Sequence, residues 1–425
     1  MTANARAQLK INTDRLMASL DELGAIGAYR DDEAGVTGVR RLALSPEDAG
    51  GRRLVRGWFE DAGLSVSTDA IGNTYADRAG LEADLAPVMS GSHVDSVPTG
   101  GRFDGALGVL GALEVVRTLN DHGVATRRPL TIAFFTDEEG CRFGTDMLGS
   151  AVATGRIPLG QAYALTDADG KSVKDELGAI GFLGTEPVGE RKPHAYVECH
   201  VEQGPTLIHE GFDLGAVTGV QGISWRRLTI TGASAHAGAT PMSFRKDAGL
   251  AAAKINCRIH EMCSSGEFGP EMRATMGVIT PEPGMINVIP GRVTATVDLR
   301  NPDDNAMRQA EAELDLYQQH VAAELGVTIE SRQTARTPAV AFDESVIAAI
   351  ESAADSQGLS HRRILAGAGH DAQEWSAVCK AAMVFTPGLN DGISHNPREL
   401  STPKHCGDGI NTLLSVILSL CDEPA

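Results

Sequence analysis

One stretch constrains this chain more than any other: residues 91–105, which read GSHVDSVPTGGRFDG. The apolar residues 87–89 before it predict the end of a buried strand, and the residues 105–119 after it, rich in Ala, Leu and Val, predict a helix. The stretch is therefore a loop at the carboxyl end of a strand, where open α/β sheets bind their ligands. Its imidazole and two carboxylates suit a divalent metal ion. A polar loop with aspartates at turns and at a helix cap fits this stretch alone equally well.

Composition limits the class of protein. A chain of 425 residues with 42% hydrophobic and 22% charged residues is typical of a soluble protein with more than one domain. The net charge of −19 argues against nucleic acid or an anionic membrane as partner. Seven scattered cysteines without a Cys-x-x-Cys motif indicate reduced thiols and a cytoplasmic location. The polar first ten residues predict no signal peptide, and we expect no membrane span.

Strands and helices alternate along the first half of the chain, which predicts an α/β sheet covered by helices. Helices are expected near residues 11–23, 46–63 and 105–119. Strands are expected at 65–69, 74–76, 88–90, 130–135 and 196–198.

The pattern changes after Gly215. Strands are expected at 225–230, 274–279, 291–300 and 327–331, with helices at 247–263 and 304–325. Residues 291–300 alternate between apolar and polar side chains, as in a strand with one buried face. The α/β pattern returns at 346–354 and 381–385, before a closing helix at 410–420. We therefore expect a split α/β domain, residues 1–213 and 331–425, with a mixed sheet flanked by helices. An α+β domain with an antiparallel sheet, residues 214–330, is inserted into it.

Four predicted strand ends carry possible metal ligands. His93 and Asp104 follow one strand, Glu139 follows strand 130–135, His200 follows strand 196–198, and His395 follows strand 381–385. Within the sequence TDEEG, the adjacent Glu138 and Glu139 point in different directions, so one can bind a metal while the other faces the substrate as a base. That motif alone also fits a solvated acidic loop. Four such ends in one chain favour a metal site.

Five motifs carry a family resemblance: GSHVDSVPTGGRFDG, FTDEEGCRFG, HVEQGP, SAHAGATPM and GISHNPRE. They resemble those of the N-carbamoyl-L-amino-acid hydrolases, along nearly the whole chain. The β-ureidopropionases and allantoate amidohydrolases are close relatives, within the superfamily of dinuclear-metal aminoacylases and carboxypeptidases. The resemblance implies a split catalytic domain with an inserted lid and dimerisation domain. It also implies an enzyme that cleaves the C–N bond of a ureido acid to amino acid, ammonia and carbon dioxide.

Other functions stay open beside this one. Allantoate amidohydrolase and β-ureidopropionase activities are the nearest alternatives, and an aminoacylase or dipeptidase is a further one. A binding protein that has lost catalysis belongs to a different class. The presence of Glu138 and of all five candidate ligands argues against that class.

The resemblance also implies a role for each site residue. His93 and His200 would hold one ion, Glu139 and His395 a second, and Asp104 both. Asp95 would accept a hydrogen bond from His93 and fix its tautomer. Glu138 would be the general base. Zn, Mn, Co and Ni all accept this set of nitrogen and oxygen ligands, so the sequence does not select the metal.

The remaining implied residues bind the substrate. Arg300 and Asn287 would grip its carboxylate, since the guanidinium offers a planar fork and the amide a directed donor. Gln203 would contact the carbamoyl end. His370, in a glycine-rich loop, would line the pocket, although a helix cap explains that loop nearly as well. His236 would reach the oxyanion across a homodimer interface formed by the inserted domain; taken alone, it resembles a surface-loop histidine.

Overall fold

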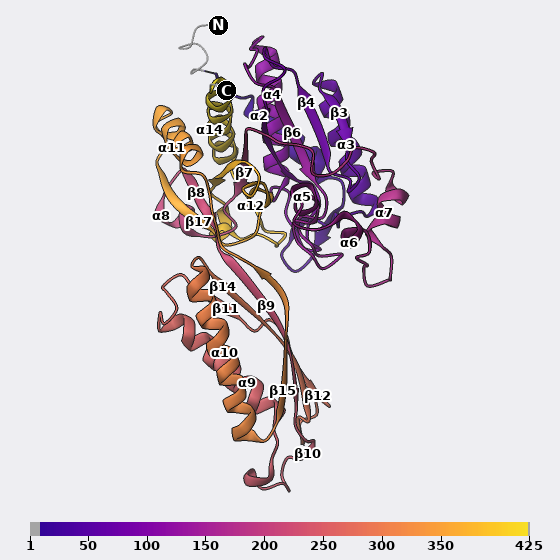
Figure 1. Ribbon diagram of the computed structural model, residues 1–425, viewed down its shortest axis with the longest axis vertical. Helices are drawn as coiled ribbons and strands as arrows, with labels where there is room; N and C mark the ends of the chain where they lie inside the picture. The colour runs from indigo at the N-terminus through magenta and orange to yellow at the C-terminus, as the bar shows by residue number, and fades with distance from the viewer. Residues whose placement is uncertain (1–8, 424–425) are drawn as a thin grey trace. The chain divides into compact units, whose positions relative to one another are not determined.

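A computed structural model describes residues 9–423, and it separates into two compact units (Figure 1). The first runs to Gly219 and resumes at Ala341, and the second is Val220–Val340. The second unit therefore begins and ends later than the expected 214–330. The reason is strand pairing, because residues 214–220 pair within the sheet of the first unit and residues 328–337 pair within that of the second. Most of the polar opening segment, for which we expect no signal peptide, lies outside the described residues.

The first unit is built on a nine-stranded mixed sheet. In the order of pairing the strands are β16 (Val340–Ala341), β8 (Leu214–Val220), β18 (Lys380–Thr386), β7 (Ala195–Val201), β5 (Val88–His93), β6 (Leu130–Phe135), β4 (Thr74–Arg78) and β3 (Ser65–Thr68), with β17 (His361–Ala366) beside β8. Strands β18, β7, β5 and β6 pair with one another in parallel, whereas β3, β4 and β8 pair antiparallel with their neighbours. The mixed sheet predicted from the sequence is thus confirmed.

Helices cover both faces of this sheet. On one face, Gly409 of α14 (Pro403–Asp422) packs so closely on Cys199 of β7 that a Cβ at Gly409 would lie 3.2 Å from the cysteine sulfur. On the other face, the Trp375 ring of α12 (Asp371–Trp375) stacks on Tyr196. Cys199 is therefore a buried packing residue, as expected from its neighbour His200 facing the opposite way. The other helices of the unit are α2 (Thr13–Gly24), α3 (Pro46–Asp61), α4 (Ala106–Asp121), α5 (Leu148–Thr154), α6 (Leu159–Tyr163), α7 (Val173–Ile180), α8 (Thr206–Glu210), α11 (Glu344–Ser356) and α13 (Leu389–Gly392).

The second unit is a five-stranded sheet with two long helices, α9 (Ala248–Ser264) and α10 (Asp304–Leu325). Its paired strands are antiparallel, and every second side chain of the central strand β14 (Arg292–Asn301) packs into a core shared with both helices. The strand expected at 274–279 is instead two short strands, both of which pair with β14. The strands are β11 (Arg273–Thr275), β12 (Ile279–Glu282), β14 (Arg292–Asn301), β9 (Gly222–Thr231) and β15 (Thr328–Thr337).

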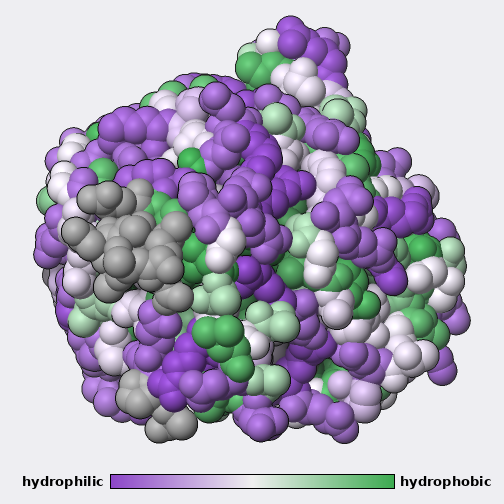
Figure 2. Space-filling model, turned by 90° about the horizontal axis from the view of Figure 1, so that it is seen from above, coloured by the Kyte–Doolittle hydropathy of each residue, from purple (hydrophilic) through white to green (hydrophobic). Residues whose placement is uncertain are grey.

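Two small antiparallel sheets of two strands each complete the fold: β1 (Ala28–Asp31) with β2 (Val36–Val39), and β10 (Ala235–His236) with β13 (Val288–Ile289). The face seen in Figure 2 is mostly hydrophilic, with apolar residues scattered over it. Within the described residues, no helix combines the length and the apolar character that crossing a membrane requires.

Candidate metal centre and active site

The candidate site lies where the strand order of the first sheet reverses. The chain passes from β5 to β6 on one side and later returns to β7 on the other, and ligands bind at such switch points, beyond the carboxyl ends of the strands. Strands β5 and β7 are in register from Val88 opposite Ala195 to Ser90 opposite Val197. Continuing that register places His93 level with His200, and their ring centroids are 6.0 Å apart. Both histidines are on the strands themselves, since β5 and β7 are longer than the sequence predicts.

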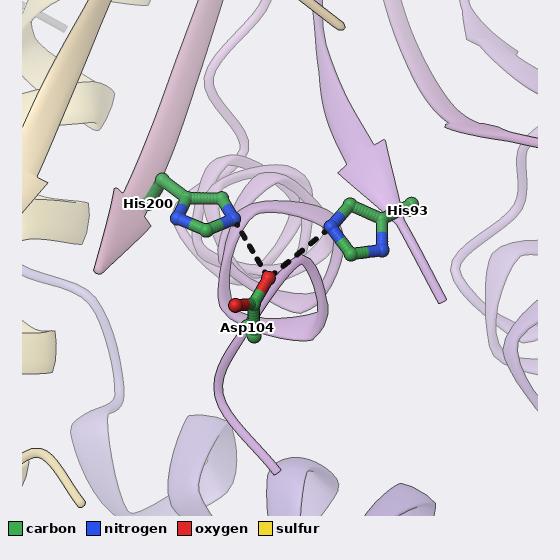
Figure 3. A group of neighbouring side chains, drawn as sticks. All are labelled: His93, Asp104 and His200. Atoms are coloured by element: carbon green, nitrogen blue, oxygen red, sulfur yellow. Dashed lines mark ion pairs between the residues drawn. The ribbon is translucent and has the colours of Figure 1, made fainter. Parts of the chain in front are cut away.

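Asp104 lies between the two histidines (Figure 3). Its Oδ1 atom is 3.3 Å from Nε2 of His93 and 3.2 Å from Nε2 of His200. All three side chains are buried. Although burial opposes ionisation, the two imidazoles hold the pKa of Asp104 well below its usual range. A buried anion facing two imidazole nitrogens is an arrangement suited to a divalent cation.

The tautomers of both histidines follow from their outer contacts. Nδ1 of His93 is 3.0 Å from the carbonyl oxygen of Asp95, and Nδ1 of His200 is 2.8 Å from that of Val201. Because a carbonyl only accepts hydrogen bonds, each Nδ1 carries the hydrogen and each Nε2 presents a lone pair. The Gly105 N–H donates to Nε2 of His200 at 3.1 Å, in agreement with this assignment.

Asp95 accepts from His93 through its backbone. Its backbone carbonyl, and not its carboxylate, accepts from His93, since the nearest carboxylate oxygen is 3.8 Å away. Strand β5 ends at His93, and the backbone path that follows brings this peptide oxygen closer to the ring than the carboxylate. The Asp95 carboxylate instead accepts long hydrogen bonds, each 3.4 Å, from the backbone N–H groups of Glu138 and Glu139. It therefore links the His93 segment to residues 137–139, which we call the acidic turn.

A second group of possible ligands shares Asp104. Nε2 of His395 is 3.1 Å from a carboxylate oxygen of Glu139 and 3.7 Å from Oδ2 of Asp104. The two oxygens of Asp104 thus belong to two different groups, His93–Asp104–His200 and Asp104–Glu139–His395. His395 has a positive φ of 54°. Such backbone strain in a non-glycine residue is a feature of functional sites.

Glu138 lies on the His93 side of the acidic turn, with Oε2 3.5 Å from Nε2 of His93. Burial raises its pKa well above the usual value, and the nearby carboxylates of Asp371 and Glu139 raise it further. Its neighbour Glu139 meets His395 instead. The two adjacent acids therefore face different partners, as the sequence predicts.

Two further predicted residues border the first group. The buried His370 ring lies 4.5 Å from the His200 ring, and burial followed by His200 lowers its pKa well below the usual value. Nε2 of Gln203 donates to Oδ2 of Asp104 at 2.8 Å. Among the described residues, neither Nε2 of His370 nor Oε1 of Gln203 has a hydrogen-bond partner. Both are polar atoms of the kind that a substrate can satisfy.

Three side chains at the site were missed from the sequence: Glu198, Ser394 and Glu399. Glu198 groups with His200 and His370, and it accepts hydrogen bonds from Ser92 Oγ at 2.6 Å and from Ala372 N at 3.0 Å. Ser394 and Glu399 lie within the motif GISHNPRE and contact the Asp104 segment. Their contacts join residues about 300 positions apart, so no local pattern reveals them.

The other predicted residues belong to the second unit. His236 is exposed, and its Nδ1 accepts from Gly238 N and Ala239 N at 3.1 Å each, which leaves the ring hydrogen on Nε2 as an outward donor. Asn287 is also exposed. It lies close to His236 in the fold, because its backbone carbonyl accepts from the N–H group of Ala237. Arg300 is half-buried, and its guanidinium contacts the Asp298 carboxylate through Nε and Nη2 at 3.0–3.1 Å.

These residues define a class of protein. A mixed α/β sheet with two overlapping groups of nitrogen and oxygen ligands at its switch point fits a metal-dependent hydrolase. Residues 89–419 match the model of Peptidase family M20/M25/M40, and the chain belongs to this family.

Individual proteins of known sequence or structure also match this chain over nearly its whole length. The chain is 40% identical over 414 residues to the N-carbamoyl-L-amino-acid amidohydrolase of Rhizobium meliloti, and the alignment covers 97% of each protein. It is 31% identical to the ureidoglycolate hydrolase of Arabidopsis thaliana, covering 98% of this chain and 88% of that protein. Among solved structures, an amidase of the hydantoinase/carbamoylase family from Burkholderia multivorans matches with a TM-score of 0.90 and 43% identity, covering 98% of this chain and all of the other.

Proposed function

We propose that this chain is an amidohydrolase that converts N-carbamoyl-L-amino acids to the amino acid, ammonia and carbon dioxide. The observation that carries the proposal is the shared carboxylate: Asp104 presents one oxygen to His93 and His200 and the other toward His395. In this proposal His93 and His200 hold one divalent ion, Glu139 and His395 hold a second, and Asp104 binds both. Zn, Mn, Co and Ni all fit the donor set.

When bound, the ions supply Lewis acidity toward the water and the carbamoyl carbonyl. Glu138, whose Oε2 lies 3.5 Å from Nε2 of His93, takes the proton of the attacking water and passes it to the leaving nitrogen. Burial raises the pKa of Glu138, which makes its carboxylate a stronger base. The atoms balance, since water adds across the C–N bond, and the released carbamate loses carbon dioxide.

Substrate recognition is assigned to side chains with directed polar atoms. Gln203 and His370 are proposed to contact the carbamoyl end, and their unpartnered polar atoms support this role. Arg300 and Asn287 are proposed to bind the carboxylate. The Asp298 contact supports this for Arg300, because it fixes the plane of the guanidinium fork.

A homodimer completes the proposal. Among the large apolar side chains exposed on the second unit are Phe244, exposed to 78%, and Ile286, exposed to 104%. They lie in the two segments that flank the hydrogen bond between Ala237 and Asn287, next to His236. Exposed apolar groups in adjacent loops suit an interface between two copies of the chain. His236 would then donate from its Nε2 to the oxyanion in the partner's site. A cytoplasmic location is proposed from the seven free thiols.

The alternative with specific support is ureidoglycolate hydrolysis, because of the Arabidopsis relative. A panel of substrates separates the two. Purified protein is incubated with N-carbamoyl-L-α-amino acids, N-carbamoyl-β-alanine, allantoate and ureidoglycolate, and ammonia release is measured. The proposal expects the highest kcat/KM for an N-carbamoyl-L-amino acid. A higher value for ureidoglycolate or allantoate would overturn it in favour of that substrate.

A further inference from the structure

Glu399 is a buried carboxylate that joins two segments of the site. Its Oε1 atom accepts from the backbone N–H groups of Phe103 at 2.8 Å and Asp104 at 3.1 Å. Its Oε2 atom is 2.7 Å from the hydroxyl oxygen of Ser394. The packing at this point has no spare room, since a Cβ placed on Gly101 would lie 2.5 Å from the Cβ of Glu399.

Ser394 continues the connection to the side chain of Asp104. Its hydroxyl oxygen is 2.6 Å from Oδ2 of Asp104, the oxygen that faces His395. The contacts therefore form a closed ring: the Asp104 backbone, the Glu399 carboxyl group, the Ser394 hydroxyl and the Asp104 carboxylate. Asp104 is held at both its main chain and its side chain by the same pair of residues.

We propose that Glu399 and Ser394 are positioning residues that set the direction of the Asp104 carboxylate. The inference rests on the ligand set of the proposed function, in which Asp104 binds both ions. A carboxylate that must serve two ions has to point each oxygen at a different partner, and outer contacts are needed to fix the two rotatable bonds of its side chain. Gln203 supplies one such contact to Oδ2, and Ser394 supplies the other. Outer contacts that orient a ligand typically contribute 10–100-fold to metal affinity.

The geometry also predicts which substitution is tolerated. In Glu399→Gln, the amide oxygen still accepts from Phe103 N and Asp104 N, and the amide N–H group donates to Ser394. The Ser394 hydroxyl can then donate to Asp104, so the ring of contacts stays closed. Glu399→Ala leaves both buried N–H groups without an acceptor. Ser394→Ala removes one of the two donors to Oδ2 of Asp104, the other being Nε2 of Gln203.

A control variant is available on the same segment. The Ser401 hydroxyl is buried and donates to the carbonyl of Pro387 at 2.9 Å. This hydrogen bond does not involve Asp104. Ser401→Ala therefore removes a hydroxyl and a hydrogen bond of the same kind without altering the ring. It tests whether general loosening of this segment is sufficient to disturb the site.

The experiment measures metal binding to the full-length protein. Metal-free wild type, Glu399→Gln, Glu399→Ala, Ser394→Ala and Ser401→Ala are titrated with Co²⁺ against a chelating dye, well below their melting temperatures. We expect affinity for at least one ion to fall about 10–100-fold in Ser394→Ala and Glu399→Ala. Glu399→Gln and Ser401→Ala should keep wild-type affinities, and the visible Co²⁺ spectrum should change only in the two weakened variants.

Three results would overturn the inference. Wild-type affinity in Ser394→Ala shows that the hydroxyl does not orient Asp104, and this variant decides the matter if Glu399→Ala does not fold. An equal loss in Ser401→Ala shows that the effect is only loosening of the segment. Fewer than two ions on the wild-type protein would instead refute the proposed ligand set, on which the inference depends.

Discussion

Asp104 and His200 meet through a single oxygen and a single nitrogen, Oδ1 and Nε2, 3.2 Å apart. Because the other nitrogen of His200 is engaged with a carbonyl, Nε2 carries the lone pair and points to the same place as Oδ1 of Asp104, where the proposed cation would bind. On the opposite side of Asp104, Nε2 of His395 lies 3.7 Å from Oδ2 and 3.1 Å from a carboxylate oxygen of Glu139, which forms the second group of possible ligands. We therefore expect two divalent ions per chain.

Metal content tests this expectation directly. Elemental analysis of the active protein should give close to two ions per chain, and dialysis against a chelator should abolish activity. Zn, Mn, Co or Ni should restore it, and circular dichroism should show that the fold survives without metal. Fully active protein with one ion or fewer would contradict the two-ion site.

Glu138→Gln tests the general base. Glutamine keeps the size of the side chain but cannot accept a proton, so kcat should fall by at least ~10²-fold while both ions stay bound. Glu139→Gln is the matched comparison, since it should lower metal content as well. If Glu138→Gln stays near wild-type activity, the base is another residue.

Gly105→Ala tests how tightly the first group is packed. Gly105 has a φ of +64°, and a Cβ there would lie 2.4 Å from atoms of the His93 ring. The ring has to move, so we expect metal affinity and activity to fall together. Gly123→Ala is the control, because Gly123 has a similar φ of +60° but no atom within 4 Å of its added Cβ. Equal metal affinity in the two variants would show that the contact with His93 is unimportant.

Arg300→Lys tests the grip on the substrate carboxylate. Lysine keeps the charge but lacks the planar fork, so KM should rise by roughly 10-fold or more while kcat changes less, since a charge-assisted hydrogen bond contributes about 1.5–3 kcal/mol. Arg292→Lys, on the same strand β14, should have little effect. Equal turnover of a substrate and its carboxamide would refute the role of Arg300.

The dimer can be tested by mixing two inactive variants, Glu138→Gln and His236→Ala. If His236 acts in the partner's site, one site of each mixed dimer has both intact residues. Random pairing makes half of the dimers mixed, so activity should recover to about one quarter of wild type.

The control for the mixing experiment is wild-type protein taken through the same dissociation and reassociation. If it recovers but the mixture stays inactive, His236 does not act across an interface. Size-exclusion chromatography coupled to light scattering shows whether dimers re-formed.

Elements with strong periodicity could be predicted closely from the sequence. Strand Leu130–Phe135 and helix Asp304–Leu325 have the expected bounds, since a continuous apolar run and a long 3.6-residue repeat leave few alternatives. Strand Leu214–Val220 was missed, because its two internal glycines weaken the pattern and its stability comes from pairing with β18. That omission also displaced the predicted domain boundary.

The candidate site also has a part that could be predicted from the sequence and a part that could not. The five proposed ligands follow strands or lie at their ends, so the sequence pattern is sufficient to predict them. The contacts of Glu399 with residues 103 and 104 arise only when the chain is folded, and nothing beside residue 399 in the sequence points to residue 104. The substitution of a carbonyl for the Asp95 carboxylate behind His93 has the same origin, because it depends on the backbone path after β5.

The second unit leaves the first from β8 and returns through β16, and these two strands are neighbours in one sheet. The point of exit and the point of re-entry are therefore held together by the sheet itself, and the core of the second unit is assembled from its own residues. If residues 220–340 are exchanged between related chains, the new segment has to fit at only two junctions, and these lie side by side on β8 and β16. The fold thus allows the part that carries Arg300 and His236 to diverge while the part that carries the proposed metal ligands is kept.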